Sequence, residues 1–367
     1  MNWQVEVFAH PLQFIEPGGT SRGVMHQRPV WYVCLSQEAN PTCCGIGECA
    51  PLFGLSAESA QEVQQSLAAI QRNPQPYITD LSLLSSVPSV RFALEMALLD
   101  YQQGGMQRWF DTPYTSGEAG IRINGLIWMG DEATMQQRID QKLAQGFSCL
   151  KLKIGAIDFE QELRLLRAIR QRYSPQDLEL RVDANGAFHP SQVNEKLQQL
   201  SACSIHSIEQ PIAPHQLKEM RELCMYSPIP IALDEELIGK VMPLDMNELL
   251  HVVRPQYIIL KPSLLGGFRQ SQTWIMIAEQ YGIGWWVTSA LESNIGLDAL
   301  AQFTSTYALS LPQGLGTGKV FSNNVPSMMD LRGEMLFHHA ESPDAMGQHA
   351  HLIRSHIRQM KKYETEC

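Results

Sequence analysis

From Ile121 onward the sequence repeats one pattern, in which a short apolar run typical of a β-strand precedes a stretch with helical periodicity. The units recur at intervals of roughly 20–30 residues, which indicates parallel strands joined by right-handed crossovers. Strands are predicted at residues 121–125, 149–155, 178–182, 205–208, 229–233, 257–261 and 284–289, with a weaker eighth at 307–311. That number of units favours a closed α/β barrel over an open sheet.

The first third of the chain lacks this rhythm and is predicted to form an α+β domain at 1–118. Antiparallel strands are expected at 5–8 and 30–35, loops rich in Gly and Pro at 16–23 and 44–56, and a helix at 89–103. The barrel is predicted to span 119–313. The remaining segment, 314–367, breaks the rhythm and is expected to pack back onto the first domain.

Composition and charge exclude several classes of protein. A net charge of −10 without a basic cluster argues against a nucleic-acid partner. Eight scattered cysteines in a chain of 367 residues indicate reduced thiols, and no second Cys or His pair completes a soft-metal site. We find neither a signal peptide at the N-terminus nor an apolar run of membrane-spanning length. The expectation is a cytoplasmic protein with a small-molecule partner; the oligomeric state stays open.

Three carboxylates follow three successive strands of the predicted barrel. Asp183, Glu209 and Asp234 each come directly after a short apolar run, about 25 residues apart. The carboxyl ends of barrel strands meet on one face, where barrel enzymes have their active sites. Oxygen ligands suit a hard cation, so the sequence predicts a Mg²⁺ site, with Mn²⁺ as an alternative.

Lysines lie at the ends of the neighbouring strands. Their presence suggests that the predicted metal site is catalytic and does not only bind a ligand. Lys151 and Lys153 lie two residues apart on one strand, so their side chains share a face, and Lys261 ends another strand. An Asp after a strand is commonly only the N-cap of the next helix, and a single lysine can be a solvated edge residue. Because charged residues occur at all of these strand ends together, the pattern favours a catalytic site over separate helix caps and surface lysines. Glu235 and Glu236 are expected to face outward or to cap a helix.

One glycine-rich segment superficially resembles a phosphate-binding loop. The stretch Gly314–Lys319 has Gln313 where such a loop needs Gly, and Val320 where it needs Ser or Thr. We therefore expect a turn-rich loop near the barrel mouth and no nucleoside triphosphate.

Taken together, these motifs resemble the enolase superfamily in its Lys-x-Lys, muconate-lactonizing-like branch, over the whole chain. The motifs are Lys151-Leu152-Lys153, Asp183, Glu209-Gln210-Pro211, Asp234-Glu235 and Lys261-Pro262-Ser263. The resemblance implies a modified (β/α)7β TIM-type barrel with an α+β capping domain. It also implies that Asp183, Glu209 and Asp234 bind Mg²⁺, that Lys153 removes the proton α to a substrate carboxylate, and that Lys261 stabilises the enediolate or acts as a second acid or base.

Within this branch the chain is most similar to the hydro-lyases of menaquinone biosynthesis. Their reaction dehydrates 2-succinyl-6-hydroxy-2,4-cyclohexadiene-1-carboxylate to 2-succinylbenzoate. The likeness is carried by Arg181, by the Ser-rich segment 288–296 and by the glycine-rich segment 314–318 with Phe321 and Asn323-Asn324. It marks Arg181, Ser289 and Asn294 as candidate substrate-binding residues, the last two for the succinyl carboxylate, and the segments 18–23 and 47–56 as covers of the site.

Two other functions remain open at the level of sequence. On the same scaffold, an N-acylamino-acid racemase or a dipeptide epimerase would use Lys153 and Lys261 as opposed bases. Dipeptide epimerases of this branch carry an Asp-x-Asp for the substrate ammonium, and none follows Asp298 here. A catalytically silent metal-binding protein is the remaining alternative, and the presence of both lysines argues against it.

Overall fold

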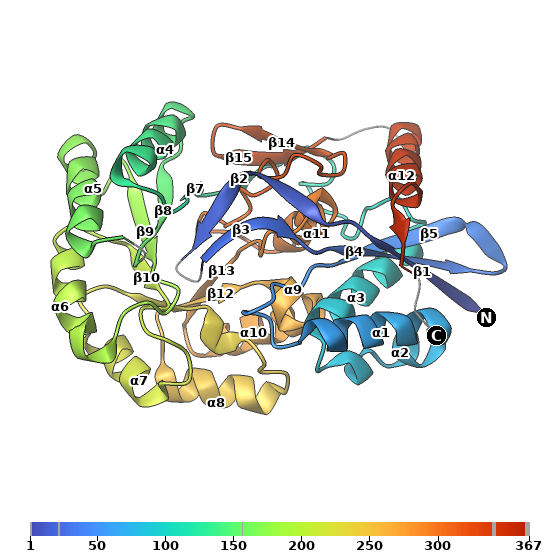
Figure 1. Cartoon of the computed structure of the whole chain (residues 1–367), viewed down its shortest axis with the longest axis horizontal. Helices are drawn as coiled ribbons and strands as arrows, with labels where there is room; N and C mark the ends of the chain where they lie inside the picture. The colour runs from blue at the N-terminus through green and yellow to red at the C-terminus, as the bar shows by residue number, and fades with distance from the viewer. Residues whose placement is uncertain (1, 21–22, 156, 340–342, 364–367) are drawn as a thin grey trace.

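The computed structural model of the protein describes residues 2–20, 23–155, 157–339 and 343–363. Two parts lie side by side: a barrel with its helices, and a capping domain of antiparallel strands and helices (Figure 1). A hairpin of the capping domain reaches over the barrel, close to the ends of its strands. This arrangement places the capping domain next to the predicted site.

Seven parallel strands form the barrel sheet, in the order β13-β12-β11-β10-β9-β8-β7. They are β7 (Gly125–Ile127), β8 (Cys149–Lys153), β9 (Glu179–Asp183), β10 (Ser207–Glu209), β11 (Ile231–Leu233), β12 (Tyr257–Leu260) and β13 (Gly284–Val287). Every strand therefore neighbours the next one in the chain, as right-handed βα units require. The predicted modified barrel with a capping domain is confirmed.

The barrel closes through a short segment that contacts both edge strands. Gln313 forms a parallel bridge with Ile123, and Gly314 forms one with Thr288. The weak eighth strand expected at 307–311 is wrong, since that stretch has no strand and the closure lies two residues further on. Gly314 suits the closure because a Cβ there would lie 2.4 Å from the Thr288 hydroxyl oxygen.

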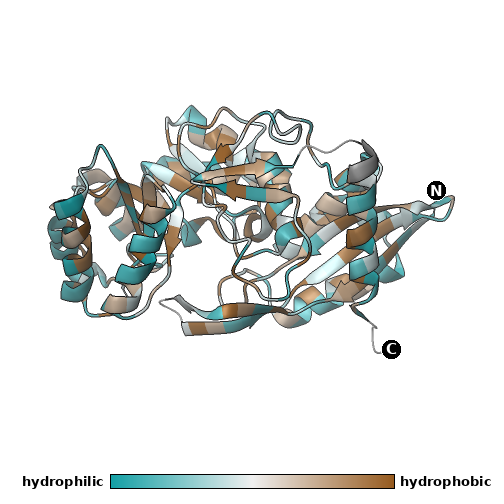
Figure 2. Ribbon diagram, turned by 90° about the horizontal axis from the view of Figure 1, so that it is seen from above, coloured by the Kyte–Doolittle hydropathy of each residue, from teal (hydrophilic) through white to brown (hydrophobic). Residues whose placement is uncertain are grey.

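The barrel helices form because each combines an N-terminal cap with one apolar face. In α5 (Phe159–Arg172) the Asp158 side chain accepts hydrogen bonds from two backbone N–H groups of the first turn, and Leu163, Leu166 and Ile169 are buried. The others are α4 (Glu132–Ala144), α6 (Pro190–Ser201), α7 (Leu217–Tyr226), η2 (Glu235–Leu237), α8 (Pro243–Val253), α9 (Pro262–Leu265), α10 (Phe268–Gln280) and α11 (Asn294–Thr304). Hydrophilic and hydrophobic stretches alternate along these helices (Figure 2).

The capping domain is a four-stranded antiparallel sheet packed on helices, in the order β16-β1-β4-β5. Its elements are β1 (Trp3–Ala9), β2 (Leu12–Thr20), β3 (Gly23–Arg28), β4 (Trp31–Gln37), β5 (Asn40–Cys49), α1 (Ala60–Arg72), α2 (Gln75–Thr79), η1 (Leu81–Leu84) and α3 (Pro88–Gln102). Helix α1 begins with a capping box in which the Ser59 and Glu62 side chains each bond the other's backbone N–H. A separate apolar core lies between this sheet and its helices.

Two predicted loops of this domain are strands instead. The stretch 44–49 belongs to β5, where Gly45 and Gly47 allow the strand to approach α3 closely: a Cβ on Gly47 would lie 1.8 Å from the carbonyl oxygen of Ala93. The glycines serve packing there and not a turn. Most of 16–23 belongs to the antiparallel hairpin β2–β3, although residues 21 and 22 lie outside the described residues.

The C-terminal segment contacts both parts of the molecule. Strands β14 (Met329–Arg332) and β15 (Met335–His338) extend a sheet with β6 (Ile121–Arg122) beside the barrel. Helix α12 (Pro343–Arg358) buries Ile353 and Ile357, and β16 (Lys361–Lys362) pairs with β1 of the capping domain. The domain bounds 1–118, 119–313 and 314–367 stay a prediction. Among the described helices, none is long and apolar enough to cross a membrane.

Candidate active site

The three predicted carboxylates end three adjacent barrel strands. Asp183 ends β9 and pairs in register with Glu209, which ends β10; Glu209 in turn pairs with Ala232, two residues before Asp234. All three side chains are buried, with 2% exposure or less. Neither Asp is a side-chain cap: the helix after β9 is capped by His189, and Asp234 makes no capping bond to η2. The structure thus brings the three carboxylates together at the carboxyl end of the barrel.

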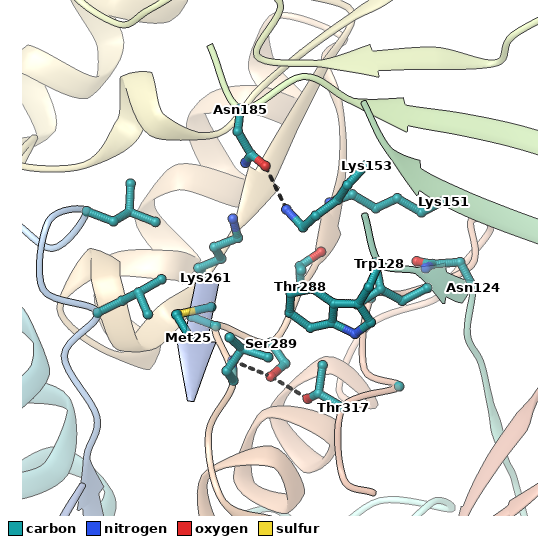
Figure 3. Close-up of a pocket in the computed structure, with 17 residues that line it drawn as sticks. Met25, Asn124, Trp128, Lys151, Lys153, Asn185, Lys261, Thr288, Ser289 and Thr317 are labelled. Carbon is teal, nitrogen blue, oxygen red and sulfur yellow. Dashed lines mark hydrogen bonds between the residues drawn. The ribbon is translucent and has the colours of Figure 1, made fainter. Parts of the chain in front are cut away.

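The three lysines line one pocket (Figure 3), and each of them contacts at least one of these carboxylates. Lys151 Nζ lies 2.5 Å from an oxygen of Glu209 and 3.0 Å from Asp183 Oδ2. Lys153 Nζ lies 3.0 Å from the same Asp183 oxygen. From the end of β12, Lys261 Nζ contacts Asp234 Oδ2 and lies 3.8 Å from Glu209 Oε1. The three adjacent carboxylates therefore lie between lysines from the strands on either side, β8 and β12.

Burial and pairing together set the charge of these groups. Burial raises the pKa of Glu209 to about 7, and the neighbouring Asp183 carboxylate adds to the rise. For Asp183, burial also acts upward, but the ammonium groups around it hold its pKa well below the usual range. For Lys261, burial acts downward, yet Asp234 and Glu209 raise its pKa overall. Burial raises the pKa of Asp234 as well, although the neighbouring Lys261 ammonium opposes the rise.

An asparagine that the sequence reasoning missed completes this cluster. Asn185 Oδ1 accepts a hydrogen bond of 2.7 Å from Lys153 Nζ, and its Nδ2 donates one of 3.1 Å to Glu235. Its φ of 46° lies in the left-handed region, which asparagine tolerates better than most residues. Its position two residues after Asp183, where the backbone turns back toward the strand end, is the sequence feature from which Asn185 could have been predicted.

Glu235 and Glu236 do not face outward as the sequence suggested. Both are buried, with exposures of 4% and 1%. Glu235 accepts the bond from Asn185, and Glu236 accepts hydrogen bonds from the Gln210 side chain and the backbone of His215. These partners come from the loops after β9 and β10, which the sequence could not place next to η2. The expectation for both residues was wrong.

The side chains of Asp183, Glu209 and Asp234 offer the kind of ligand atom that a hard divalent cation prefers. All three side chains offer carboxylate oxygens, and Glu209 Oε1 is buried without a hydrogen-bond partner among the described residues. Within the ranges described, however, no three His, Cys, Asp or Glu side chains are arranged to hold a metal ion. The ammonium groups of Lys151 and Lys261 lie against the carboxylates instead.

A pocket opens above the lysines, between the barrel and the capping domain. The three lysines and Asn185 line it on one side, and Thr288, Ser289 and Thr317 on another (Figure 3). Apolar side chains of the capping domain complete the wall, namely Met25, Leu52 and Leu55. Met25 belongs to the hairpin strand β3, and the two leucines follow β5. The capping domain therefore covers the site with apolar side chains.

Of the three residues predicted to bind substrate, only Ser289 lines this pocket. Asn294 begins α11, donates a hydrogen bond to the backbone of Val325 and lines a neighbouring cavity. Arg181 is 1% exposed and lies deeper in the barrel, where it bonds Glu179 at 2.7 Å and stacks on Trp286. Direct contact of Asn294 or Arg181 with a ligand in this pocket is not supported by these positions.

Family models match both parts of the chain. A model described as "Enolase C-terminal domain-like" matches residues 134–324, and one described as "MenC, N-terminal domain" matches residues 20–101. An o-succinylbenzoate synthase from Desulfotalea psychrophila is 47% identical over 357 residues, which cover 89% of this chain and 96% of that protein.

Solved structures agree with these matches. The crystal structure of MenC from Desulfotalea psychrophila aligns with a TM-score of 0.81 at 42% identity, covering 92% of this chain and all of that one. The L-Ala-D/L-Glu epimerase from Bacillus subtilis aligns with a TM-score of 0.76 over 92% and 96% of the two chains, but its 19% identity supports likeness of fold alone. The chain belongs to the enolase superfamily and, within it, to the o-succinylbenzoate synthases.

Proposed function

We propose that the chain converts 2-succinyl-6-hydroxy-2,4-cyclohexadiene-1-carboxylate to 2-succinylbenzoate and water, the hydro-lyase step of menaquinone biosynthesis, with Lys153 as its acid–base group. One observation carries the assignment of roles: Lys153 and Lys261 extend from different strands into one pocket, beside three buried carboxylates. Membership of the family identifies the reaction, and the positions of these residues indicate which side chain takes part in each step.

Asp183, Glu209 and Asp234 would hold Mg²⁺, and the bound ion would supply positive charge beside the substrate carboxylate as negative charge develops there. Their acceptor oxygens support this role, as does Glu209 Oε1, which accepts no hydrogen bond from any described residue. Lys151, which contacts both Asp183 and Glu209, would fix the distance between these two carboxylates.

Lys153 would act first as a base and then as an acid. Its Nζ takes the proton from the ring carbon next to the carboxylate, and the electrons of that C–H bond move into an enediolate. The enediolate then collapses to form a ring double bond, the C–O bond to the 6-hydroxyl breaks, and the Lys153 ammonium returns its proton to the leaving oxygen as water forms. Asn185 supports this role because it holds Nζ at 2.7 Å and so limits its position.

Lys261 would stabilise the enediolate from another side of the pocket. Its pKa is raised overall because Asp234 and Glu209 outweigh the effect of burial, so it stays an ammonium group at neutral pH. A fixed positive charge in a pocket largely closed to water stabilises a developing anion more strongly than the same charge in solvent. The apolar residues Met25, Leu52 and Leu55 support that role by limiting access of water.

The first experiment is an absorbance assay of the dehydration with Mg²⁺, with EDTA, and with Lys153→Ala. We expect turnover in the wild type, its loss on removal of the metal, and a fall of about 10²–10⁴-fold in kcat for the variant. Affinity for 2-succinylbenzoate should change little, because the carboxylates remain.

Lys196→Ala is a matched control, since Lys196 packs over the rings of Phe159 and Phe188 away from the pocket. It should leave kcat unchanged. Substantial turnover by Lys153→Ala would reject the role of Lys153. A folded, Mg²⁺-loaded wild type without turnover would reject the dehydration, and α-proton exchange in N-acylamino acids would then point to the racemase.

A further inference from the structure

A second cavity adjoins the active-site pocket and exceeds it in size. Its volume is about 590 Å³, whereas the pocket that the three lysines line measures about 80 Å³. Gly316 lines both spaces, so they meet at the glycine-rich stretch Gly314–Lys319. Small-molecule sites are commonly clefts of about 300–1,000 Å³, and none of the side chains assigned to the dehydration lines this one.

Apolar side chains form a large part of the cavity wall. They come from the residue after β6, from α11, from the glycine-rich stretch and from the hairpin β14–β15: Ile123, Leu297, Leu315, Met329, Leu331 and Leu336. Four of them are at most 5% exposed, namely Ile123, Leu297, Leu315 and Leu336. Because covering apolar surface removes it from water, a ligand with an apolar body gains free energy by packing on this wall.

Among the described residues, two lysines are the only charged side chains that line this cavity. Lys142, on α4, is partly buried, and Lys319, in the glycine-rich stretch, is exposed. No Asp or Glu of the described residues lines the cavity, although the whole chain carries a net charge of −10. Burial lowers the pKa of Lys142, and the positive charge of Lys319 adds to the fall, so the two ammonium groups lie close enough to repel each other.

Lys142 keeps hydrogen atoms for a ligand. An ammonium group has three hydrogens to donate. Among the described residues, Lys142 Nζ donates one of them to Gln145 Oε1 over a long 3.4 Å, and it lies 4.9 Å from the centre of the Phe147 ring. An anion placed between Lys142 and Lys319 would accept charge-assisted hydrogen bonds and offset the repulsion between the two lysines. The cavity therefore combines an apolar wall with a preference for negative charge.

We propose that this cavity is a second ligand site, which binds a small organic carboxylate with an apolar body. The carboxylate lies between Lys142 and Lys319, and the apolar body packs on the leucines of α11 and β15. A free phosphate ion would leave the apolar wall in contact with water, and a neutral apolar compound would leave the lysines without a counter-charge. The site does not depend on the dehydration, because none of its side chains takes part in that reaction.

The test measures binding by calorimetry with Mg²⁺-loaded protein and three probes. 4-Phenylbutyrate has an apolar body and a carboxylate, 4-phenylbutan-1-ol has the body without the charge, and butyrate has the charge without the ring. We expect 4-phenylbutyrate to bind at least about 10-fold more tightly than either of the others. Lys142→Gln and Lys319→Gln should each raise its Kd about 3- to 10-fold, because each removes one positive charge, and should leave the affinity for the alcohol within twofold.

Further variants locate the bound compound. Leu331→Trp fills the cavity from β14 and should abolish binding of 4-phenylbutyrate, whereas Met225→Trp, at a 56% exposed position of α7, should not change it. Lys196→Gln is the control for the lysine variants, because Lys196 packs over the rings of Phe159 and Phe188.

A charge reversal separates recognition from folding. The double variant Lys142→Glu/Lys319→Glu should bind 4-phenylbutylamine in place of the acid, which an unfolded protein would not do. Unchanged affinity for 4-phenylbutyrate in Leu331→Trp and in the lysine variants would place the compound elsewhere and overturn the proposal. A folded wild type that binds 4-phenylbutyrate no better than the alcohol would overturn it as well. Both readings are independent of turnover, so they stand apart from the test of the dehydration.

Discussion

At the scale of single residues, the site depends on charges that compensate one another out of water. Asp183, Glu209 and Asp234 are at most 2% exposed, and Lys151 is 4% exposed. Withdrawing one such charge from water costs several kcal/mol unless a partner is close. Removal of one member therefore leaves its partner buried and uncompensated, so substitutions here affect folding as well as catalysis.

Glu292 gives a residue-scale test outside the catalytic groups. It is fully buried, and its two oxygens accept hydrogen bonds from Ser263 Oγ, Ser289 Oγ and Ala290 N. Glu292→Gln replaces one acceptor oxygen by a donor, so at least one of these donors loses its partner. We expect the free energy of unfolding, measured with urea, to fall by about 1–3 kcal/mol.

Glu132→Gln is the matched control for this change. Glu132 forms an exposed ion pair with Arg164 at 3.0 Å, and such a pair contributes about 0–1 kcal/mol. Equal losses in the two variants would contradict the role given to the buried carboxylate.

At the scale of elements, the close approach of β5 to α3 fixes the shape of the capping domain. Gly45 and Gly47 lie against the backbone of α3, where a Cβ would approach main-chain oxygens to 2.0 and 1.8 Å. The same strand leads into Leu52 and Leu55, which line the pocket. Packing far from the catalytic lysines thus determines where the cover of the site lies.

Gly47→Ala should force β5 away from α3, since neither backbone can move without losing its own hydrogen bonds. We expect a loss of about 3 kcal/mol in the free energy of unfolding, measured by chemical denaturation.

Gly347→Ala, in α12, is the control for this substitution. Its Cβ would lie 3.5 Å from the side chain of Met106, which is ordinary contact, and alanine favours a helix by about 1 kcal/mol. A Gly47→Ala protein as stable as the wild type would show that the two elements are not in rigid contact.

At the scale of the whole molecule, two carboxylates of the capping domain hold helices of the barrel. Glu48, on β5, accepts hydrogen bonds from Ser293 N, Ser293 Oγ and Gly296 N at the start of α11. Glu95, on α3, accepts from Phe268 N and Arg269 N at the start of α10. The backbone N–H groups at a helix start have no partner within the helix, so these acceptors satisfy them and tie the two parts together.

Glu48 makes stability depend on pH. Burial raises its pKa from 4.5 to about 7, so the folded state holds a proton that the unfolded state has already released. Its contribution to stability is fully present below about pH 4.5 and is lost as the pH rises through about 7. Relative to Glu48→Gln, the wild type should lose up to about 3 kcal/mol over that range, measured by urea unfolding at several pH values.

The difference between the two proteins isolates Glu48 from Asp100, whose pKa burial also raises to about 7. A difference that stays constant from pH 4.5 to 8 would show that Glu48 does not titrate in this window.

Much of this architecture is encoded locally. The alternation of apolar runs and helical stretches predicts the barrel, and the charges at the strand ends predict Lys151, Lys153, Asp183, Glu209 and Asp234 at one face. These patterns can be read because each strand and helix carries its own periodicity, and parallel strands place their ends on one side.

Other features depend on contacts between distant segments. The sequence predicted a loop for 44–56 because glycine commonly marks turns. Gly47 instead packs against the backbone of a helix almost fifty residues further along the chain. Glu235 and Glu236 were expected to face outward or to cap a helix, but both are buried and bond partners from two other loops. Local patterns do not state which element lies opposite a residue.

For this protein, the sequence by itself determined the fold class, the order of the barrel strands and the set of charged residues at their ends. Only the tertiary structure decided which polar groups are already paired: it commits Ser289 to Glu292, and it places Asn294 and Arg181 outside the pocket. The physical reason is that a residue's type fixes which hydrogen bonds it can make, whereas its partners come from segments that meet only in the folded chain.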